Sequence, residues 1–375
     1  MIVGIFCAVL TCYVLLILSL MYGFWKLPKI KQQHIASTVD FSVIIPFRNE
    51  ATHLPKLLQS IAHLKYPIPK MTFWFVDDAS EDDSCKIIEQ FRKEHSTFNI
   101  YILQNKRVSN SPKKDAITTA ISQIQSDWII TTDADCMLPM NWLAFFNQEI
   151  AIKQPKMIAA PVTYQKTTSF FSYFQLLDFL SLQGTTMGSF GLQLPFMCNG
   201  ANLAYQKEAF LEVHGFSGND TIASGDDVFL LEKFIQKWPK KVVYLKTKSA
   251  LVHTYAVNTF KELVSQRMRW ASKSANYTLL RGKLIGVLVL LMNLLFCILP
   301  CLVFTSVSWK FLLCVAVLKI LIDSFLLAQT LHFTQQKFKF FYFLFSTLLY
   351  PFFTIFIFLK SLVSTYTWKN RVFKK

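Results

Sequence analysis

The run FSVIIP at residues 41–46 is the first of four short β-type runs in this chain. The other three are TFWFV at residues 72–76, NIYIL at residues 99–103 and WIITT at residues 128–132. Helical patterns fill the stretches between them, at residues 51–64, 83–94 and 114–125. Such alternation is typical of an α/β domain with a largely parallel sheet. We therefore predict one α/β domain over residues 38–282, which is long enough to bury its own core.

The composition of the whole chain is that of a membrane protein. Of 375 residues, 53% are hydrophobic and 17% are charged, whereas charged residues make up about 25% of a soluble chain. Lys and Arg number 39 against 23 Asp and Glu, an excess that favours anionic lipid surfaces over nucleic acid as a partner. The eight cysteines include no CxxC pair, so neither a zinc site nor a disulfide framework is supported.

Residues 1–25 carry no charged side chain and, at about 1.5 Å per helical residue, are long enough to cross a bilayer. We predict an N-terminal transmembrane helix here. The alternative is a cleaved signal peptide, but the basic segment and the small-residue cleavage site that it needs are missing. Lys26, Lys29 and Lys31 follow directly. The positive-inside rule then predicts a multi-pass protein of the cell (inner) membrane, with its α/β domain in the cytoplasm.

Further membrane segments lie within residues 284–359. Their ranges are residues 284–309, 311–331 and 340–359. Three spans would leave the basic tail of residues 360–375 outside the cell, against the positive-inside rule. Two interpretations stay open: three spans, or two spans and one re-entrant or interfacial segment. Lys319 and Asp323 stand four apart, and we interpret them as a neutralising pair within a helix bundle rather than as a transport site.

Asp77 and Asp78 follow the second β-type run, where an α/β sheet places its ligand crevice. Carboxylates at such a strand end can accept hydrogen bonds from a uracil imide or a ribose hydroxyl. An N-cap for a helix that starts near Glu81 is an equally good interpretation of these two residues alone.

Asp133 and Asp135 follow the run WIITT in the motif TTDADC. Two carboxylates one residue apart at a strand end can hold a hard divalent cation, which takes its remaining ligands from water and a diphosphate. An Asp-x-Asp alone is weak, because turns are rich in Asp. The β-type run before it and the apolar residues 137–146 after it favour a buried site.

Asp226 and Asp227 stand between Gly225 and a probable helix in the motif SGDDVFL. Adjacent acids at a helix start are usually caps and partners of the helix dipole. The functional alternative is that one of them removes a proton from an acceptor hydroxyl.

Gln266, Arg269 and Trp270 belong to the motif QRMRW, just ahead of a membrane segment. An Arg suits a diphosphate, and an indole face suits stacking on a sugar. A basic and aromatic membrane belt is the strong alternative for this motif alone. His253 is interpreted as structural.

Seven motifs in order give the chain a resemblance to membrane-bound family 2 glycosyltransferases over about residues 40–275. The motifs are SVIIPFRNE, VDDAS, Lys113 ahead of Ala116 and Ile117, TTDADC, CNGANLAY, SGDDVFL and QRMRW. The resemblance implies a GT-A fold, a Rossmann-like mixed sheet with helices. It also implies a nucleotide-diphosphate sugar donor such as a UDP-sugar, a Mg²⁺ or Mn²⁺ ion, and inversion at the anomeric carbon.

The resemblance also assigns roles to residues of this chain. Those that match the donor nucleotide-binding positions are Pro46, Glu50, Asp77, Asp78, Lys113 and Asp133. Asp133 and Asp135 match the metal pair, and Asp227 matches the catalytic base. Gln266, Arg269 and Trp270 match the motif that closes over the diphosphate and the acceptor, and our own hypothesis adds Asn199 and Asn202 as residues that line the acceptor side. Two departures weaken this transfer of roles: Pro112 stands where a Gly often precedes the lysine, and the Gly-Asp-Asp sequence leaves Asp226 as a second candidate base.

The resulting hypothesis is an inverting transferase that moves a sugar to a membrane-associated lipid or glycan in a single metal-dependent displacement. A processive polysaccharide synthase is the first alternative. A sugar-nucleotide pyrophosphorylase would lack a reason for membrane spans, and the Gly-rich loop expected for it is missing. A non-catalytic membrane scaffold is disfavoured by the complete set of acidic residues.

Residues 169–196 are very apolar for part of a soluble domain, with Asp178 as the single charge. We expect an interfacial amphipathic helix that guides a lipid-borne hydroxyl towards Asp227. Its three glycines, Gly184, Gly188 and Gly191, favour a mobile loop. The alternative is that the apolar stripe belongs to the core.

Overall fold

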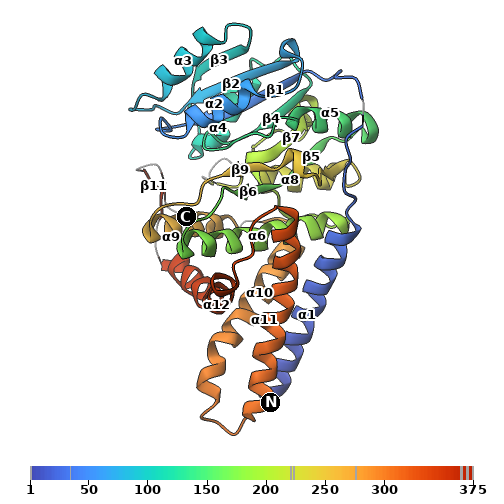
Figure 1. Cartoon of the computed structure of the whole chain (residues 1–375), viewed down its shortest axis with the longest axis vertical. Coiled ribbons are helices and arrows are strands. Elements are labelled where there is room, and N and C mark those ends of the chain that lie inside the picture. Colours follow the sequence, from blue (N-terminus) through green and yellow to red (C-terminus); the bar gives the residue numbers. More distant parts are fainter. Residues whose placement is uncertain are drawn as a thin grey trace.

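The computed structural model has a sheet domain that lies on one end of a bundle of long helices (Figure 1). The structure describes residues 2–33, 35–219, 222, 224–274, 277–363, 366–368 and 371–373. Lys369, Lys374 and Lys375 of the expected basic tail lie outside the described residues. The α/β class with apolar helices towards both ends is confirmed.

The main sheet of the described chain has seven strands in the order β3-β2-β1-β4-β7-β5-β8. The four strands predicted from the sequence are β1 (Phe41–Phe47), β2 (Met71–Asp77), β3 (Asn99–Gln104) and β4 (Trp128–Thr131), and they are parallel. The remaining three are β5 (Met157–Ala159), β7 (Leu203–Gln206) and β8 (Val242–Tyr244). Only β7 runs antiparallel to its neighbours β4 and β5, so the sheet is mixed. A separate pair, β6 (Val162–Tyr164) and β9 (Val252–Thr254), is parallel.

Helices cover both faces of the sheet because successive strand side chains point to opposite sides. In β1, Val43 and Ile45 belong to one buried cluster and Ile44 belongs to another. The first cluster includes residues of α2 (Leu54–Ala62), α3 (Ser84–Glu94) and α5 (Trp142–Lys153). The second includes residues of α4 (Pro112–Ile121), α7 (Lys207–Glu212) and α8 (Asp226–Lys237). Short 3-10 turns occur at Ile68–Lys70, Gly200–Asn202 and Lys248–Ala250.

Four helices of the described chain are long and apolar enough to cross a membrane. They are α1 (Ile2–Lys26), α10 (Leu280–Leu302), α11 (Trp309–Phe333) and α12 (Phe340–Val363). In Figure 1, α1, α10 and α11 run side by side away from the sheet domain, and they share one buried cluster. The expected pair Lys319 and Asp323 forms within this bundle at 2.8 Å, and Tyr13 of α1 donates to Asp323 at 2.6 Å.

Three other helices lie at the end of the bundle nearest the sheet domain: α6 (Phe170–Gly191), α9 (Phe260–Ser274) and α12 (Figure 1). α12 contacts mainly α6, α9 and α10, and it does not share the cluster of the other three long helices. The ring of Phe174 in α6 meets that of Phe353 in α12 at 5.2 Å. A small hairpin of β10 (Tyr366–Trp368) and β11 (Arg371–Phe373) follows α12, and β10 lies against α9.

The glycines of α6 are part of a packed helix, and the expectation of a mobile loop at this stretch is wrong. α6 continues to Gly191, with Gly188 and Gly191 buried. A Cβ atom added at Gly188 would lie 2.5 Å from the carbonyl oxygen of Leu20, and one at Gly191 would lie 1.8 Å from that of Gly23. Small residues thus allow the backbones of α1 and α6 to touch.

Candidate active site

A cavity of about 1860 Å³ opens where the carboxyl ends of the parallel strands meet the helices α6 and α9. Most of the site residues predicted from the sequence line it: Pro46, Glu50, Asp78, Lys113, Asp133, Asp135, Asn199, Asp226, Asp227, Gln266, Arg269 and Trp270. The same cavity continues between the long helices as far as Tyr13 and Asp323. It is therefore larger than the roughly 300–1,000 Å³ of an ordinary small-molecule pocket.

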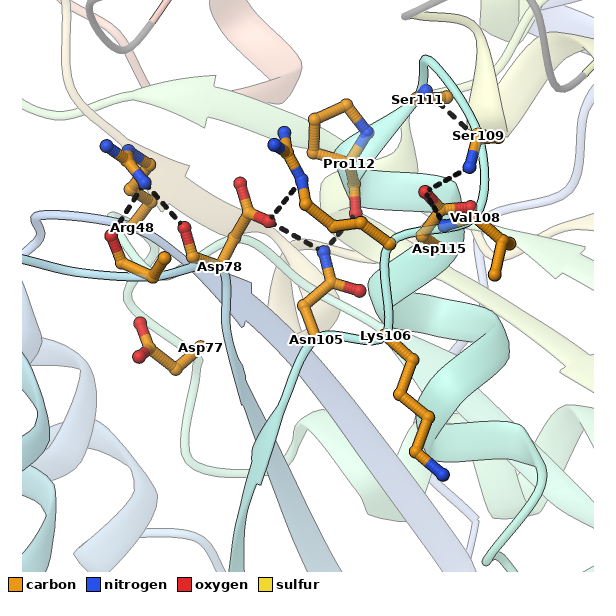
Figure 2. Close-up of polar contacts among 12 residues, drawn as sticks. Arg48, Asp77, Asp78, Asn105, Lys106, Val108, Ser109, Ser111, Pro112 and Asp115 are labelled. Carbon is orange, nitrogen blue, oxygen red and sulfur yellow. Dashed lines mark hydrogen bonds and ion pairs between the residues drawn. The ribbon is translucent and has the colours of Figure 1, made fainter.

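At one end of the cavity, the two acids after β2 have different roles. The buried carboxylate of Asp78 accepts from Asn105 Nδ2 at 2.8 Å and from Arg107 Nε at 3.0 Å. Arg48 donates to the backbone oxygen of Asp78 at 2.8 Å and so fixes the turn (Figure 2). Asp77 accepts from the backbone N–H of Ser80 at 2.9 Å, and it lies apart from this network. Asp77 therefore caps the turn and is not among the described residues that line the cavity.

Lys113 connects two of the acidic motifs. Its Nζ lies 2.7 Å from Asp133 Oδ1 and 3.2 Å from Asp226 Oδ2. Burial lowers the pKa of Lys113, but these carboxylates outweigh it and raise the pKa above its ordinary value. Pro112 is the first residue of α4, a position that tolerates proline because its N–H would have no partner in the helix. The departure at Pro112 thus leaves Lys113 directed into the cavity.

The carboxylates of the TTDADC motif lie just beyond β4, and Asp133 is the one of the two that pairs with Lys113. Burial, followed by the charges of Asp133 and Glu50, raises the pKa of Asp135 to about 6, while a 3.1 Å hydrogen bond from Thr254 opposes the shift. Among the described residues, no group of three or more His, Cys, Asp or Glu could hold a metal alone. Two carboxylates that face a cavity still fit Mg²⁺ or Mn²⁺, which keep water and phosphate oxygens as ligands.

The two acids of the SGDDVFL motif also pair with different residues. Gly225, with φ of +86°, makes the sharp turn that starts α8. Asp226 faces Lys113, whereas Asp227 faces Lys273 of α9, whose Nζ lies 3.1 Å from Asp227 Oδ1. Burial raises the pKa of Asp227, but Lys273 and then Lys113 outweigh it, so the pKa is below its ordinary value. Asp227 is therefore ionised at neutral pH.

Gly200 has no side chain and so leaves room for the carboxylates of Asp226 and Asp227. It lies in the 3-10 turn before β7, and its N–H points to Asp227 Oδ2 at 3.3 Å. A Cβ atom at this position would lie 2.7 Å from Asp226 Oδ2.

Asn199 and Asn202, which lie close to Gly200 in the chain, have different surroundings. Asn199 lines the cavity, with its Oδ1 accepting from the N–H of Ala201 at 2.9 Å. Asn202 is fully buried: its amide donates to the carbonyls of Pro161 and Ala250, each at 2.8 Å, and accepts from Trp142 at 2.9 Å. The expectation that Asn202 lines the acceptor side is therefore wrong; it holds the loop together.

The QRMRW motif lies in α9, and its residue Arg267 is held from α6. Arg267 is buried, forms an ion pair with Asp178 of α6 and donates to Gln266. Its guanidinium lies 4.1 Å from the ring centre of Trp270, and the Trp270 ring also lies 6.1 Å from that of Phe179. Trp270 is thus fixed as part of the cavity wall.

Sequence reasoning missed three residues of this site: Gly200, Arg267 and Lys273. Gly200 and Arg267 lay inside motifs that were recognised, but their contacts cross between distant segments. Lys273 had a usable signal, because it follows Gln266 by seven residues and Arg269 by four, which places all three on one helix face.

Comparisons with known proteins identify the family of this chain. The sequence model of glycosyl transferase family 21 matches residues 11–375. A beta-monoglucosyldiacylglycerol synthase from Nostoc sp. is 24% identical over 252 residues, which are 65% of this chain and 51% of that protein. A poly-beta-1,6-N-acetyl-D-glucosamine synthase from Staphylococcus epidermidis is 24% identical over 360 residues, 93% of this chain and 81% of that protein.

The chain spans only about half the length of the first of these relatives. Among solved structures, the mannosyltransferase PcManGT from Pyrobaculum calidifontis, in complex with GDP-Man and Mn²⁺, has a TM-score of 0.56 at 15% identity. The similarity covers 97% of this chain and 99% of that one, and it shows a common fold. By its sequence match over nearly all of its length, the chain belongs to glycosyl transferase family 21.

Proposed function

We propose that this protein transfers a sugar, with inversion, from a nucleotide-diphosphate donor to a lipid held in the membrane. The observation that carries the proposal is the continuous cavity. It contains Asp78, Asp135 and Asp227 at one end and reaches Tyr13 and Asp323 between the long helices at the other. A water-soluble acceptor would not need that second part.

In this proposal the donor lies along the strand ends. Asp78 binds the nucleoside, and Lys113 and Arg269 balance the negative charge of the diphosphate. Asp133 and Asp135 would hold Mg²⁺ or Mn²⁺, which stabilises the charge on the departing nucleotide diphosphate. A UDP-sugar is the donor that the sequence motifs favour, whereas the solved relative from Pyrobaculum calidifontis has GDP-Man.

Asp227 carries out the proton transfer. Its carboxylate takes the proton of the acceptor hydroxyl while the oxygen forms a bond to the anomeric carbon and the bond from that carbon to the diphosphate breaks. Asp226 is the second candidate for the base; it pairs at 3.2 Å with Lys113, the lysine that also pairs with Asp133 on the donor side. Trp270, held by Arg267, presents an apolar face on the acceptor side.

A polysaccharide acceptor is the second candidate. It is favoured by the relative from Staphylococcus epidermidis, a polysaccharide synthase that aligns with 93% of this chain. The relative from Nostoc sp. is a glycolipid synthase. The helix bundle favours the lipid, because α1, α10 and α11 share one buried cluster and few long helices remain to form a polymer channel.

We also propose that the sheet domain faces the cytoplasm at the inner membrane. Lys26, Lys29 and Lys31 lie at the domain end of α1. Since α12 lies beside the domain end of the bundle, only α1, α10 and α11 would cross, and the residues after α12 would return to the cytoplasmic side (Figure 1).

The test incubates membranes that contain the protein with radiolabelled UDP-glucose, UDP-N-acetylglucosamine or GDP-mannose. The lipids are then extracted, and the label transferred to them is measured. We expect one donor to label a lipid, and Asp227→Asn to lower the rate by about 10²- to 10⁴-fold. Asp83→Asn, at an exposed carboxylate away from the cavity, is the matched control. Near wild-type transfer by Asp227→Asn would refute the base assignment. A labelled polymer with no labelled lipid would favour the polysaccharide.

A further inference from the structure

Lys273 is a buried cation that no motif includes. It lies near the end of α9, three residues after Trp270, and its side chain is 14% exposed. Its Nζ lies 3.1 Å from Asp227 Oδ1 and 3.5 Å from Oδ2. Burial lowers the pKa of Lys273, but Asp227 outweighs it and raises the pKa, so Lys273 stays positively charged.

The two oxygens of Asp227 are held unequally. Oδ1 accepts from the backbone N–H of Val228 at 2.7 Å and from Lys273 at 3.1 Å. Oδ2 has longer contacts, 3.3 Å from the N–H of Gly200 and 3.5 Å from Lys273. Oδ2 is therefore the oxygen with more capacity to take a new hydrogen bond from a substrate hydroxyl.

The backbone around Lys273 is fixed to the helix that carries Asp227. Before it, Ser224 Oγ donates to the carbonyl of Arg269 at 3.1 Å. After it, the carboxylate of Glu232 in α8 accepts from the N–H groups of Thr278 and Leu279 at 3.0 Å each. Glu232 is buried, and α10 begins directly afterwards at Leu280. The contact between Lys273 and Asp227 is thus a fixed feature of the joint between α8, α9 and α10.

We infer that Lys273 is a positioning residue for the base: it holds Asp227 by Oδ1 and leaves Oδ2 to the acceptor hydroxyl. The inference rests on the proposed role of Asp227. In the transfer step the hydroxyl proton moves to Oδ2, the acceptor oxygen bonds to the anomeric carbon, and the diphosphate leaves with the electron pair of the broken bond. Lys273 keeps its proton throughout, so it acts only through Asp227.

This arrangement predicts a pH effect with a definite sign. The ionisable groups around Asp227 come from five segments. They are Lys273 on α9, Lys113 on α4, Asp226 on α8 itself, and Cys198 and Tyr277 in the adjoining loops. Lys273 and Lys113 lower the pKa of Asp227 against the effect of burial, so removing Lys273 leaves burial less opposed. Asp227 is then protonated at a higher pH than in the wild type, so the acid limb of the pH–rate profile moves to higher pH.

The experiment compares Lys273→Met, Lys273→Arg and Asp227→Asn in the full chain, with Lys240→Gln as an exposed control. Initial rates of label transfer are measured against pH with the active donor of the three named above. For Lys273→Met we expect kcat to fall about 10- to 100-fold, since misplacing a catalytic group by about 1 Å costs about that much. The acid limb moves to higher pH, the donor KM stays at the wild-type value, and Lys273→Arg keeps the wild-type limb.

Three results would overturn the inference. A wild-type acid limb and rate in Lys273→Met would show that Asp227 does not depend on Lys273. A raised donor KM with an unmoved acid limb would instead make Lys273 a diphosphate ligand. The Met and Arg variants could instead lose the same amount of folded protein while the remaining activity keeps the wild-type acid limb. That result would make the role of Lys273 structural. If Asp227→Asn transfers normally, the proposed function fails instead, and the two failures remain separate.

Discussion

Replacement of Gly200 by alanine tests the geometry of the two acids most directly. Gly200 is not among the described glycines with positive φ, so an alanine there strains no backbone torsion. Its Cβ atom would lie 2.7 Å from Asp226 Oδ2, 3.4 Å from Lys113 Nζ and 3.5 Å from Asp227 Cβ. The added methyl group thus meets three side chains of the site.

The size of the effect follows from these distances. Ordinary contact begins at 3.4 Å, so the Asp226 carboxylate must move by about 0.7 Å, and Lys113 must move with it. A displacement of about 1 Å can cost about 10²-fold in rate, so we expect kcat to fall about 10- to 100-fold in Gly200→Ala. Overpacking costs about 1–3 kcal/mol, which a folded domain of this size can tolerate.

The assay is label transfer at saturating donor, with thermal unfolding measured in the same detergent. Gly4→Ala, where nothing lies within 4 Å of the added Cβ atom, is the matched control. A Gly200→Ala protein that folds normally and transfers sugar at the wild-type rate would refute the reasoning. It would mean that the arrangement of Asp226, Lys113 and Gly200 does not limit the reaction.

Three further predictions concern the ion pair under the cavity, the metal and the topology. Arg267→Met should destabilise the protein by about 3–5 kcal/mol because it leaves Asp178 buried without its partner, and adding Asp178→Leu should recover part of the loss in thermal unfolding. Chelation by EDTA should stop transfer and Mg²⁺ or Mn²⁺ should restore it; activity that survives exhaustive chelation would exclude a metal role for Asp133 and Asp135. A cysteine at Ser37 should resist an impermeant thiol reagent in intact cells and react after lysis, when compared with the protein that lacks it; labelling in intact cells would contradict a cytoplasmic domain.

The sequence predicts the donor half of the site well because its signals are local. The apolar runs that become β1, β2 and β4 end directly before residues of the cavity, and parallel strands bring their carboxyl ends to one edge. Asp78, Asp133 and Asp135 could therefore be placed by counting from a strand end. Their partners could not be placed in this way, since Asn105 and Arg107 lie in an irregular loop after β3.

The acceptor half was harder to predict because it depends on contacts between distant segments. Periodicity predicts an apolar helix within residues 169–196, whereas the glycines of this stretch favour a loop. Nothing local shows that Gly188 meets Leu20 of α1, or that Asp178 pairs with Arg267. Asn202 is the reverse case. Its motif predicts a place on the acceptor side, but its buried amide donates to the backbone and holds the loop together.

These distant contacts connect Asp227, the proposed base, to the membrane helices in a series. α1 touches α6 at Gly188, α6 holds α9 through Asp178 and Arg267, and α9 holds Asp227 through Lys273. The donor groups depend instead on the sheet, which has its own buried clusters on both faces. Because α8, which carries Asp227, packs on the sheet, a substitution at the crossing of α1 and α6 is expected to disturb the contact of Lys273 with Asp227 more than the position of α8 itself. In the proposed mechanism, the acceptor hydroxyl comes from the membrane and meets Asp227, the proposed base, whose partner Lys273 lies on α9.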